Sequence, residues 1–159
     1  MATLTLYTPA ELVFVSWISS IPGLTANGVA TQLPANEKSW AASGFVVVPV
    51  TVGGSPHMYM AVHRPVGQVE CWATNPNSDK LPWAKANQLV EQIYRGTLDR
   101  RFFGRALNIT AGGVAYPTAT VKAATMLTEA RRIWSDVGDY AGFTFDLQLE
   151  YVQQGDTTP

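Results

Sequence analysis

The stretch that most constrains the fold lies near the C-terminus, where apolar and polar residues alternate strictly. The apolar positions are Phe143, Phe145, Leu147, Leu149 and Tyr151, and the polar positions between them are Thr144, Asp146, Gln148 and Glu150. Successive side chains of a β-strand point to opposite faces of its sheet. The segment from 143 to 151 is therefore predicted to be a strand with one face in the core and the other in water.

A second alternating run comes before this strand and is predicted to be its partner. In Val121–Leu127, one face would carry Val121, Ala123, Thr125 and Leu127. The connector between the two strands, Thr128–Tyr140, contains both signs of charge and two aromatic residues. A short hairpin turn does not need such chemistry, so we expect the connector to contact a partner.

Further strands are expected at Val46–Val52, Met58–Val62 and Val69–Ala73, with a short one within Asn27–Pro34. The first is rich in β-branched residues, and alternation would place on one face Val46, Val48, Val50 and Val52. Pro49 lacks an N–H group, so it is expected at a sheet edge or a bulge. The turn-forming pair Gly53-Gly54 favours a β-hairpin between the strands around it.

Two helices are predicted. Thr8-Pro9-Ala10-Glu11 has the pattern of a helix start, with Thr8 as the N-cap and Pro9 at the first helical position. The segment that follows, Leu12–Ser19, is apolar nearly all round, which is typical of a buried helix. Trp83–Leu98 is amphipathic, with apolar residues at helical spacing along one side. Arg105–Tyr116 is interpreted as loop-like, with room for a strand inside it.

The order of elements predicts an α+β fold. Helix, strands, helix and strands follow one another without regular strand–helix alternation or an internal repeat. We expect a mostly antiparallel β-sheet with two main helices packed on one face. The 159 residues favour a single domain, 1–159, and the polar residues 152–159 are expected to form a frayed tail.

The composition points to a subunit that buries surface against other chains. Charged residues make up only 14% of the sequence, whereas soluble domains average about 25%. The net charge of −1 argues against a general nucleic-acid binder. The single cysteine, Cys71, excludes an intrachain disulfide and is expected to be a small buried apolar residue. The longest apolar runs are too short for a membrane span, and no signal peptide is recognisable.

Catalytic and metal sites are not predicted. His57 and His63 are too far apart along a strand to share a metal, and no third zinc-type ligand lies nearby in the sequence. Nothing activates the Cys71 thiol as a nucleophile. Gly53-Gly54 and Gly112-Gly113 lack the helix and lysine of a phosphate-binding loop and are interpreted as turns. The chain is therefore not expected to be an enzyme or to bind a cofactor.

Three arginines crowd the end of the second predicted helix. Arg100, Arg101 and Arg105 favour the negative C-terminal end of the helix dipole. They could simply cap the helix and be solvated, or they could form a patch at an interface or in a lumen. Aromatic and arginine residues near loops are typical of interface anchors.

A series of short motifs resembles a known family. In order along the chain they are Trp72-Ala73-Thr74-Asn75-Pro76, Pro82-Trp83, Asp99-Arg100-Arg101, Leu127-Thr128-Glu129-Ala130-Arg131-Arg132, Asp136, Asp139-Tyr140-Ala141 and Asp146-Leu147. The series resembles tail terminator proteins of long-tailed, non-contractile (siphovirus-type) bacteriophages, the kind found in phages of actinobacteria. The resemblance runs from about residue 45 to residue 152, and its motifs are structural rather than catalytic.

The resemblance implies a ring-forming structural subunit of the virion. Such proteins are small α+β subunits that assemble, in the host cytoplasm, into a homohexameric ring in the neck between head and tail. The ring caps the tail tube formed by the major tail tube protein, stops its polymerisation and docks to the head connector. Phage DNA passes through the lumen without sequence-specific contact, and no membrane is involved. The alternatives are a head-closure or tail-completion protein and, from another class, a monomeric ligand-binding or enzymatic domain.

The same resemblance guides the prediction of interface residues. The candidates for a subunit or partner interface are Arg100, Arg101, Arg131, Arg132, Trp134, Asp136 and Asp139. Charge pairs at an interface fix orientation and partner choice more than they raise affinity. The alternative is that the charges of the connector are braces within one chain.

Overall fold

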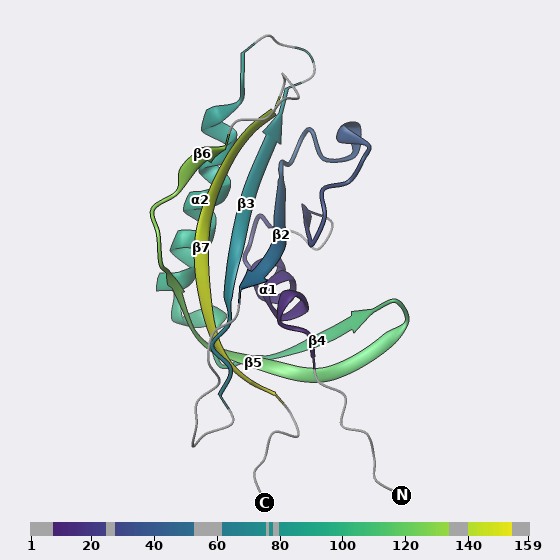
Figure 1. The fold of residues 1–159 in the computed structure, drawn as a ribbon, viewed down its shortest axis with the longest axis vertical. Helices are drawn as coiled ribbons and strands as arrows, with labels where there is room; N and C mark the ends of the chain where they lie inside the picture. The colour runs from purple at the N-terminus through teal and green to yellow at the C-terminus, as the bar shows by residue number, and fades with distance from the viewer. Residues whose placement is uncertain are drawn as a thin grey trace, which may run out of the picture.

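In a computed structural model, the described residues are 8–24, 28–52, 62–75, 77, 80–133 and 140–153. Within them lie two α-helices, seven strands and two 3₁₀ turns (Figure 1). The elements are α1 (Ala10–Ser19), β1 (Val29–Ala30), η2 (Glu37–Ser39), β2 (Phe45–Val52), β3 (Val66–Thr74), α2 (Trp83–Leu98), η3 (Arg100–Phe102), β4 (Ala106–Ala111), β5 (Val114–Met126), β6 (Arg131–Ile133) and β7 (Tyr140–Gln153).

Strand β7, which the alternation of its sequence predicts as a strand, lies at the centre of the sheet. The strand order is β1-β2-β3-β7-β5-β4, and β6 also pairs with β7. Every pairing is antiparallel except the short parallel pairing of β1 with β2. This confirms an α+β fold with a mostly antiparallel sheet.

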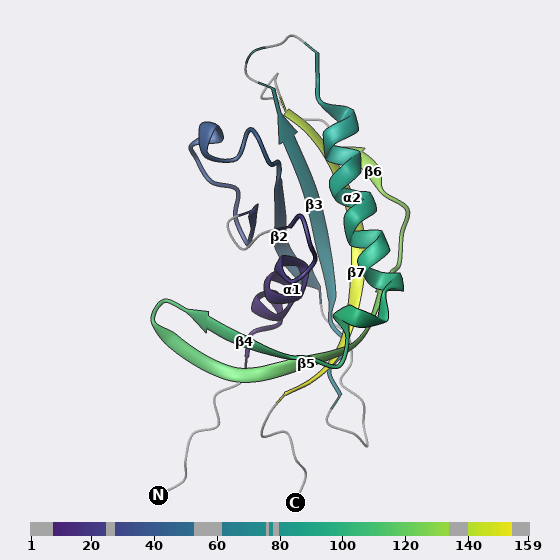
Figure 2. The same cartoon turned by 180° about the vertical axis from the view of Figure 1, so that it is seen from behind.

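Both helices cover the same face of the sheet, and Figure 2 shows them in front of β2, β3 and β7. The alternating face of β7 supplies the core, because Phe145, Leu147 and Leu149 are fully buried. Gly67 of β3 permits close packing of α1, since a Cβ there would lie 2.9 Å from the ring of Phe14. Cys71 is also buried in this core, as predicted.

Two of the three register shifts in the described sheet change which of the predicted residues face the core. In β2 the register shifts between Val47 and Val50, so Val46 and Val48 are buried while Val50 is 47% exposed. The prediction that four valines share a face is therefore wrong, whereas Pro49 lies within the irregularity, where its missing N–H is tolerated.

The bulge in β5 has a similar effect. The register shifts between Val121 and Ala123, so Val121 faces the core but the following core positions are Ala124 and Met126. The predicted common face of Val121, Ala123, Thr125 and Leu127 is wrong beyond the bulge. A bulge adds one residue and thereby exchanges the two faces, which strict alternation cannot foresee.

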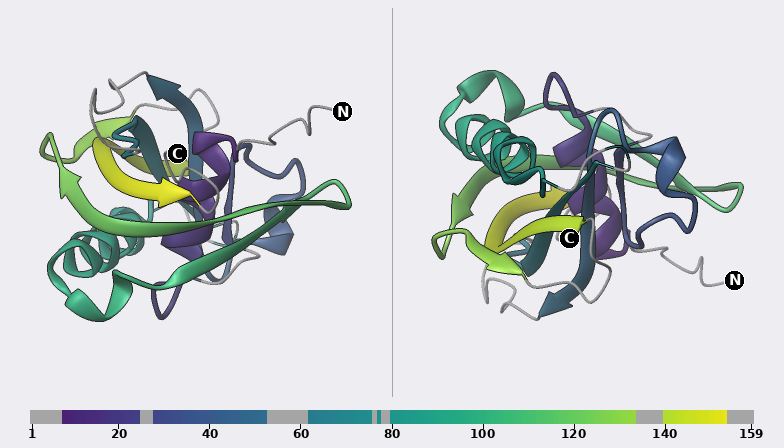
Figure 3. Two further views of the ribbon diagram at one scale, coloured as in Figure 1. Left: turned by 90° about the horizontal axis from the view of Figure 1, so that it is seen from below. Right: turned by 90° about the horizontal axis from the view of Figure 1, so that it is seen from above.

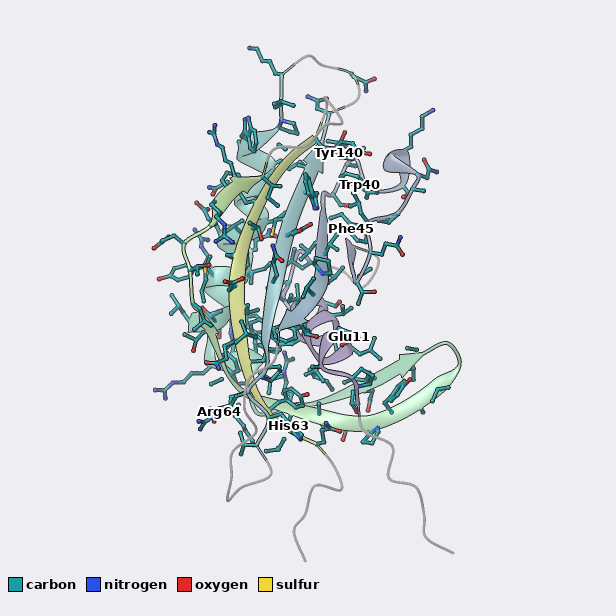
Figure 4. The ribbon with its side chains drawn as sticks, in the orientation of Figure 1. Glu11, Trp40, Phe45, His63, Arg64 and Tyr140 are labelled. Carbon is teal, nitrogen blue, oxygen red and sulfur yellow. The ribbon has the colours of Figure 1, made fainter. Side chains whose placement is uncertain are left out.

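A smaller cluster covers part of the other face of the sheet. Trp40, Phe45 and Val47 are buried together, with Tyr140 and Trp72 packed against them. The ring centroids of Trp40 and Tyr140 are 5.3 Å apart in an edge-to-face arrangement. Figure 4 shows Trp40, Phe45 and Tyr140 near one end of the sheet, and His63 and Arg64 near the other end.

Strands β4 and β5 form a long hairpin, where a loop-like segment was predicted. The turn between them, Gly112-Gly113, has positive φ values of 57° and 78°, which suit a two-residue type I′ turn and favour glycine. Ile109 is buried against the core cluster, whereas Thr110 and Val114 are exposed. The hairpin curves away from the body like an arm (Figure 1). The segment Arg105–Tyr116 alternates weakly, so the sequence left room for only one strand inside it, whereas the later part of β5 was predicted as the strand Val121–Leu127.

Two boundaries also differ from the predictions. The N-cap of α1 is Pro9, without a side-chain cap, because the Thr8 hydroxyl donates instead to the Pro117 carbonyl oxygen at 2.7 Å. The Thr8 N–H donates to Oε1 of Gln153 at 3.0 Å. Strand β7 therefore continues to Gln153, two residues into the segment expected to fray. The predicted strand residues 58–61 and the turn at 53–54 lie outside the described residues.

Candidate functional site

Cys71 and His63, which the sequence analysis considered as catalytic candidates, both pack against neighbouring residues of the fold. Cys71 is fully buried, and burial, together with the charge of Glu70, raises the pKa of its thiol. His63 stacks on Tyr151 with ring centroids 5.1 Å apart; His57 lies outside the described residues. Among the residues that the structure describes, no three His, Cys, Asp or Glu side chains gather as a metal site would require. None of the described helices is long and apolar enough to cross a membrane.

Arg100 and Arg101 lie in η3, directly after α2, and both are exposed. Arg101 forms an ion pair with Asp99, with 2.7 Å between Nη2 and Oδ2. The same carboxylate accepts a hydrogen bond from the Arg101 backbone N–H and caps the turn. The hydrogen bonds from the Arg101 side chain to this carboxylate, and next the one from its backbone N–H, lower the pKa of Asp99, and the side-chain hydrogen bonds raise the pKa of Arg101. Arg105 lies over the Phe102 ring, 5.7 Å from its centroid.

Arg131 and Arg132 form the first two positions of β6, and both are exposed. The Arg132 guanidinium lies 4.5 Å from the ring centroid of Trp83, the first residue of α2. Trp83 in turn meets Phe143 of β7 edge to face at 5.7 Å. A cation over an aromatic face is attracted by the ring quadrupole. Arg132 therefore helps to hold β6 against α2 within one chain.

The two arginine pairs do not form one patch. Helix α2 has 16 residues, which corresponds to a length of about 24 Å at 1.5 Å per residue. Arg132 lies at its first residue and Arg100 follows its last, so the helix separates them. Trp134, Asp136 and Asp139, also predicted at an interface, lie outside the described residues. A common interface for all seven candidates stays a prediction.

A groove, which sequence reasoning missed, runs between α2 and the segment from 126 to 130. Its volume is about 530 Å³, and its lining residues are Asn87, Val90, Glu91, Tyr94, Met126, Leu127, Thr128, Glu129 and Ala130. The groove exists because β5 and β6 pair with the same strand but do not meet. Met126 pairs with Leu147 and Arg131 pairs with Thr144. The chain from Met126 to Arg131 is therefore longer than the stretch of β7 from Thr144 to Leu147 that it runs beside. The surplus chain bows outward beside α2.

The groove is walled by apolar and acidic side chains. Tyr94 is 48% exposed and Leu127 is 47% exposed, and both line it. Glu91 and Glu129 contribute carboxylates to the same space. Glu91 Oε1 accepts a hydrogen bond of 3.3 Å from Asn87 Nδ2. The arrangement suits a slender apolar segment that also offers hydrogen-bond donors.

The hairpin arm is the second surface that was missed. From Ala106 to Val121 the sequence contains no charged residue. This uncharged stretch is the sequence feature that could have indicated the arm. Val114 near the turn is 45% exposed. A Cβ built at Gly112 or Gly113 would meet no heavy atom within 4 Å, so the turn lies in open space.

No protein-family model and no curated protein sequence matches the chain. Among solved structures, it is similar to a chain of the structure titled "Virion of native gene transfer agent (GTA) particle", with 10% identity and a TM-score of 0.48. That match covers 92% of this chain and 87% of the other. A second solved chain is 15% identical with a TM-score of 0.33, covering 96% and 99%. Both likenesses are distant, so the function must be inferred from the residues of this chain.

Proposed function

We propose that this chain is a structural protein of a phage virion, and more specifically a tail terminator. Its copies form a ring, with six members, on the end of the tail tube. The ring stops the addition of tube subunits and presents the surface to which the head connector docks. DNA passes through the lumen without sequence-specific contact, and the protein has no catalytic role.

The observation that carries the proposal is the uncharged hairpin arm. A two-stranded hairpin is only marginally stable in water, and the tip of this one, Thr110–Ala115, extends beyond the last core contact at Ile109. An arm of this kind suits a subunit whose neighbours cover it after assembly. The low charged fraction of 14% and the ordered motifs between 45 and 152 support the same proposal.

The oligomeric state provides the first experiment. Light scattering of the purified chain should give six times the 17.3 kDa mass of one subunit, and negative-stain electron microscopy should show closed rings. A protein that remains monomeric at all concentrations contradicts the proposal. It would instead favour the monomeric binding or enzymatic domain considered from the sequence.

The action on the tube distinguishes a terminator from other neck proteins. Rings added to tube protein from the same phage, while it polymerises, should shorten the tubes and be visible at one tube end. A head-closure or tail-completion protein would also form rings but would leave tube length unchanged. The comparison therefore decides between the two kinds of neck protein.

The predicted interface charges can be tested with two neighbouring arginines. Reversal of Arg131 or Arg132 to Glu should weaken assembly if either side chain lies at the subunit boundary. Because Arg132 also packs on Trp83, Arg131→Glu is the cleaner variant. A second reversal, Asp136→Arg or Asp139→Arg, should restore the ring mass if that carboxylate is the partner. An unchanged mass in both single variants would leave these arginines as braces within one chain.

A further inference from the structure

The large exposed apolar side chains suggest how the copies meet. The described residues of this kind are Val50, Tyr94, Leu98, Val114 and Leu127. Two of them, Tyr94 and Leu127, line the groove beside α2, and a third, Val114, is at the arm tip. Apolar surface of this kind marks interaction sites when it is gathered at a concave or projecting feature.

The arm tip has the shape and chemistry that the groove requires. It is slender, since Ala111, Gly112, Gly113 and Ala115 carry at most a methyl group. The last residue pair of the β4–β5 ladder is Ala111 with Val114, so the N–H groups of the two central turn residues are not part of the ladder. Gly112 and Gly113 thus offer donors, whereas Glu91 and Glu129 in the groove are acceptors. Hydrogen bonds from backbone N–H groups to a carboxylate are among the stronger ones.

The edge of the arm is also open to another chain. Strand β4 ends the sheet in the strand order of the described residues. Its sequence, Ala106–Ala111, contains none of the lysines, other charges or prolines that usually protect an edge strand from pairing. An arm inserted into a neighbour would be shielded from non-specific pairing.

The arm and the groove lie on opposite sides of the subunit. In Figures 1 and 2 the arm tip points away from the side on which α2 and β6 lie, and both views of Figure 3 agree. A contact between two different surfaces of identical subunits repeats head to tail, and it closes into a ring when the rotation permits.

We propose that the arm tip of one copy, Thr110–Ala115, docks into the groove between α2 and the 126–130 segment of the next copy. Val114 packs against Tyr94 and Leu127 of the neighbour, and the turn N–H groups face Glu91 and Glu129. This inference rests on the proposed ring and names the contact that closes it. The occupant is a second copy of this chain rather than a tube or connector protein.

Cysteine cross-linking tests the contact directly. A chain carrying both Val114→Cys and Leu127→Cys should form a ladder of disulfide-linked oligomers on mild oxidation, visible on a non-reducing gel. An equimolar mixture of the two single variants should give cross-linked dimers and nothing larger. The native Cys71 should not interfere, because it is fully buried and burial raises the pKa of its thiol.

A matched control comes from Val50, which is 47% exposed, as Leu127 is, but lies in β2. The pair Val50→Cys and Leu127→Cys should give no ladder. Equal cross-linking by the control and test pairs would overturn the proposal, since random collisions would then explain both. An absence of cross-links in a protein that still forms rings would overturn it as well.

Charge substitution provides an independent measurement. Val114→Asp places a carboxylate against Glu91 and Glu129 and should raise the dissociation constant for assembly by roughly a hundredfold, because like charges across an interface repel strongly. Val50→Asp should leave it unchanged. Adding Glu129→Lys to Val114→Asp should recover much of the loss.

The outcomes separate this inference from the proposed function. A ring of normal mass with Val114→Asp, and without cross-links at 114 and 127, removes the arm from the interface but leaves the ring. A wild-type chain that never assembles removes both. Binding of tube protein to the groove of a ring whose arms are free would also overturn the contact between copies.

Discussion

The centre of β7 and the tip of the β4–β5 hairpin show two uses of an apolar strand residue. Phe145 is fully buried under the helices, whereas Val114 is 45% exposed at the end of the arm. Both belong to antiparallel strands. The first contributes to the stability of one subunit, whereas the second is covered only in part within the subunit. The difference teaches that strand formation and burial are separate properties in this fold.

The largest effect is expected at the centre of β7. Phe145→Ala should lower the free energy of unfolding by about 3–5 kcal/mol, because it removes buried surface and leaves a cavity. Since domains of this size are stable by only about 5–15 kcal/mol, the loss should be plain in chemical denaturation. A midpoint equal to that of wild type would show that Phe145 is not part of the core.

A smaller effect is expected where a glycine permits close packing. At Gly142 of β7 a Cβ would lie 2.6 Å from Cζ3 of Trp72, a rigid ring. Gly142→Ala should therefore lower the free energy of unfolding by about 1–3 kcal/mol, as overpacking does. Gly113→Asn serves as the control, because its turn is open and Asn tolerates positive φ. Equal losses from both changes, measured by denaturation, would contradict the contrast between body and arm.

The contact between β6 and α2 should contribute less. Arg132→Gln removes the cation over Trp83 and should lower the free energy of unfolding by about 0.5–1 kcal/mol, the value typical of exposed pairs. Its neighbour provides the control, since Arg131→Gln removes the same charge from an exposed strand position. We expect the two variants to differ in thermal unfolding. Identical shifts of the melting temperature would mean that the contact of Arg132 with the aromatic ring of Trp83 adds no stability.

The smallest effect on the isolated subunit is expected at the arm tip. Val114→Ala should change the free energy of unfolding by no more than about 0.5 kcal/mol, because its side chain is exposed. The measurement should be made at a concentration where light scattering finds monomers. A loss as large as that of Phe145→Ala would mean that the arm folds back on its own core.

Much of the body could be predicted from the sequence. The alternation around Phe145 and the helical spacing in Trp83–Leu98 each reflect a periodicity that the structure keeps, and the β-branched run at Val46 correctly predicted a strand there. The faces of β2 and β5 could not be predicted beyond their bulges. A single added residue exchanges core and solvent positions, and no local pattern marks where the addition falls.

The candidate interface was predicted only in part. The sequence singled out charged residues, and the structure brings Arg132 to Trp83 and Arg101 to Asp99 within one chain. The sequence analysis did not identify the arm or the groove as a candidate interface. The absence of charge between Ala106 and Val121 was visible, but an uncharged segment is equally typical of a buried strand.

The sequence by itself determined the two helices, the strands with clear periodicity or β-branched residues and the class of the fold, because these follow from local propensity and periodicity. Only the tertiary structure decided which surfaces remain uncovered. The groove depends on the separation of β5 and β6 along β7. The exposure of Val114 depends on how far the hairpin extends beyond its contact with α1. Both are distances between residues remote in sequence, and burial is set by such distances rather than by the identity of any one residue.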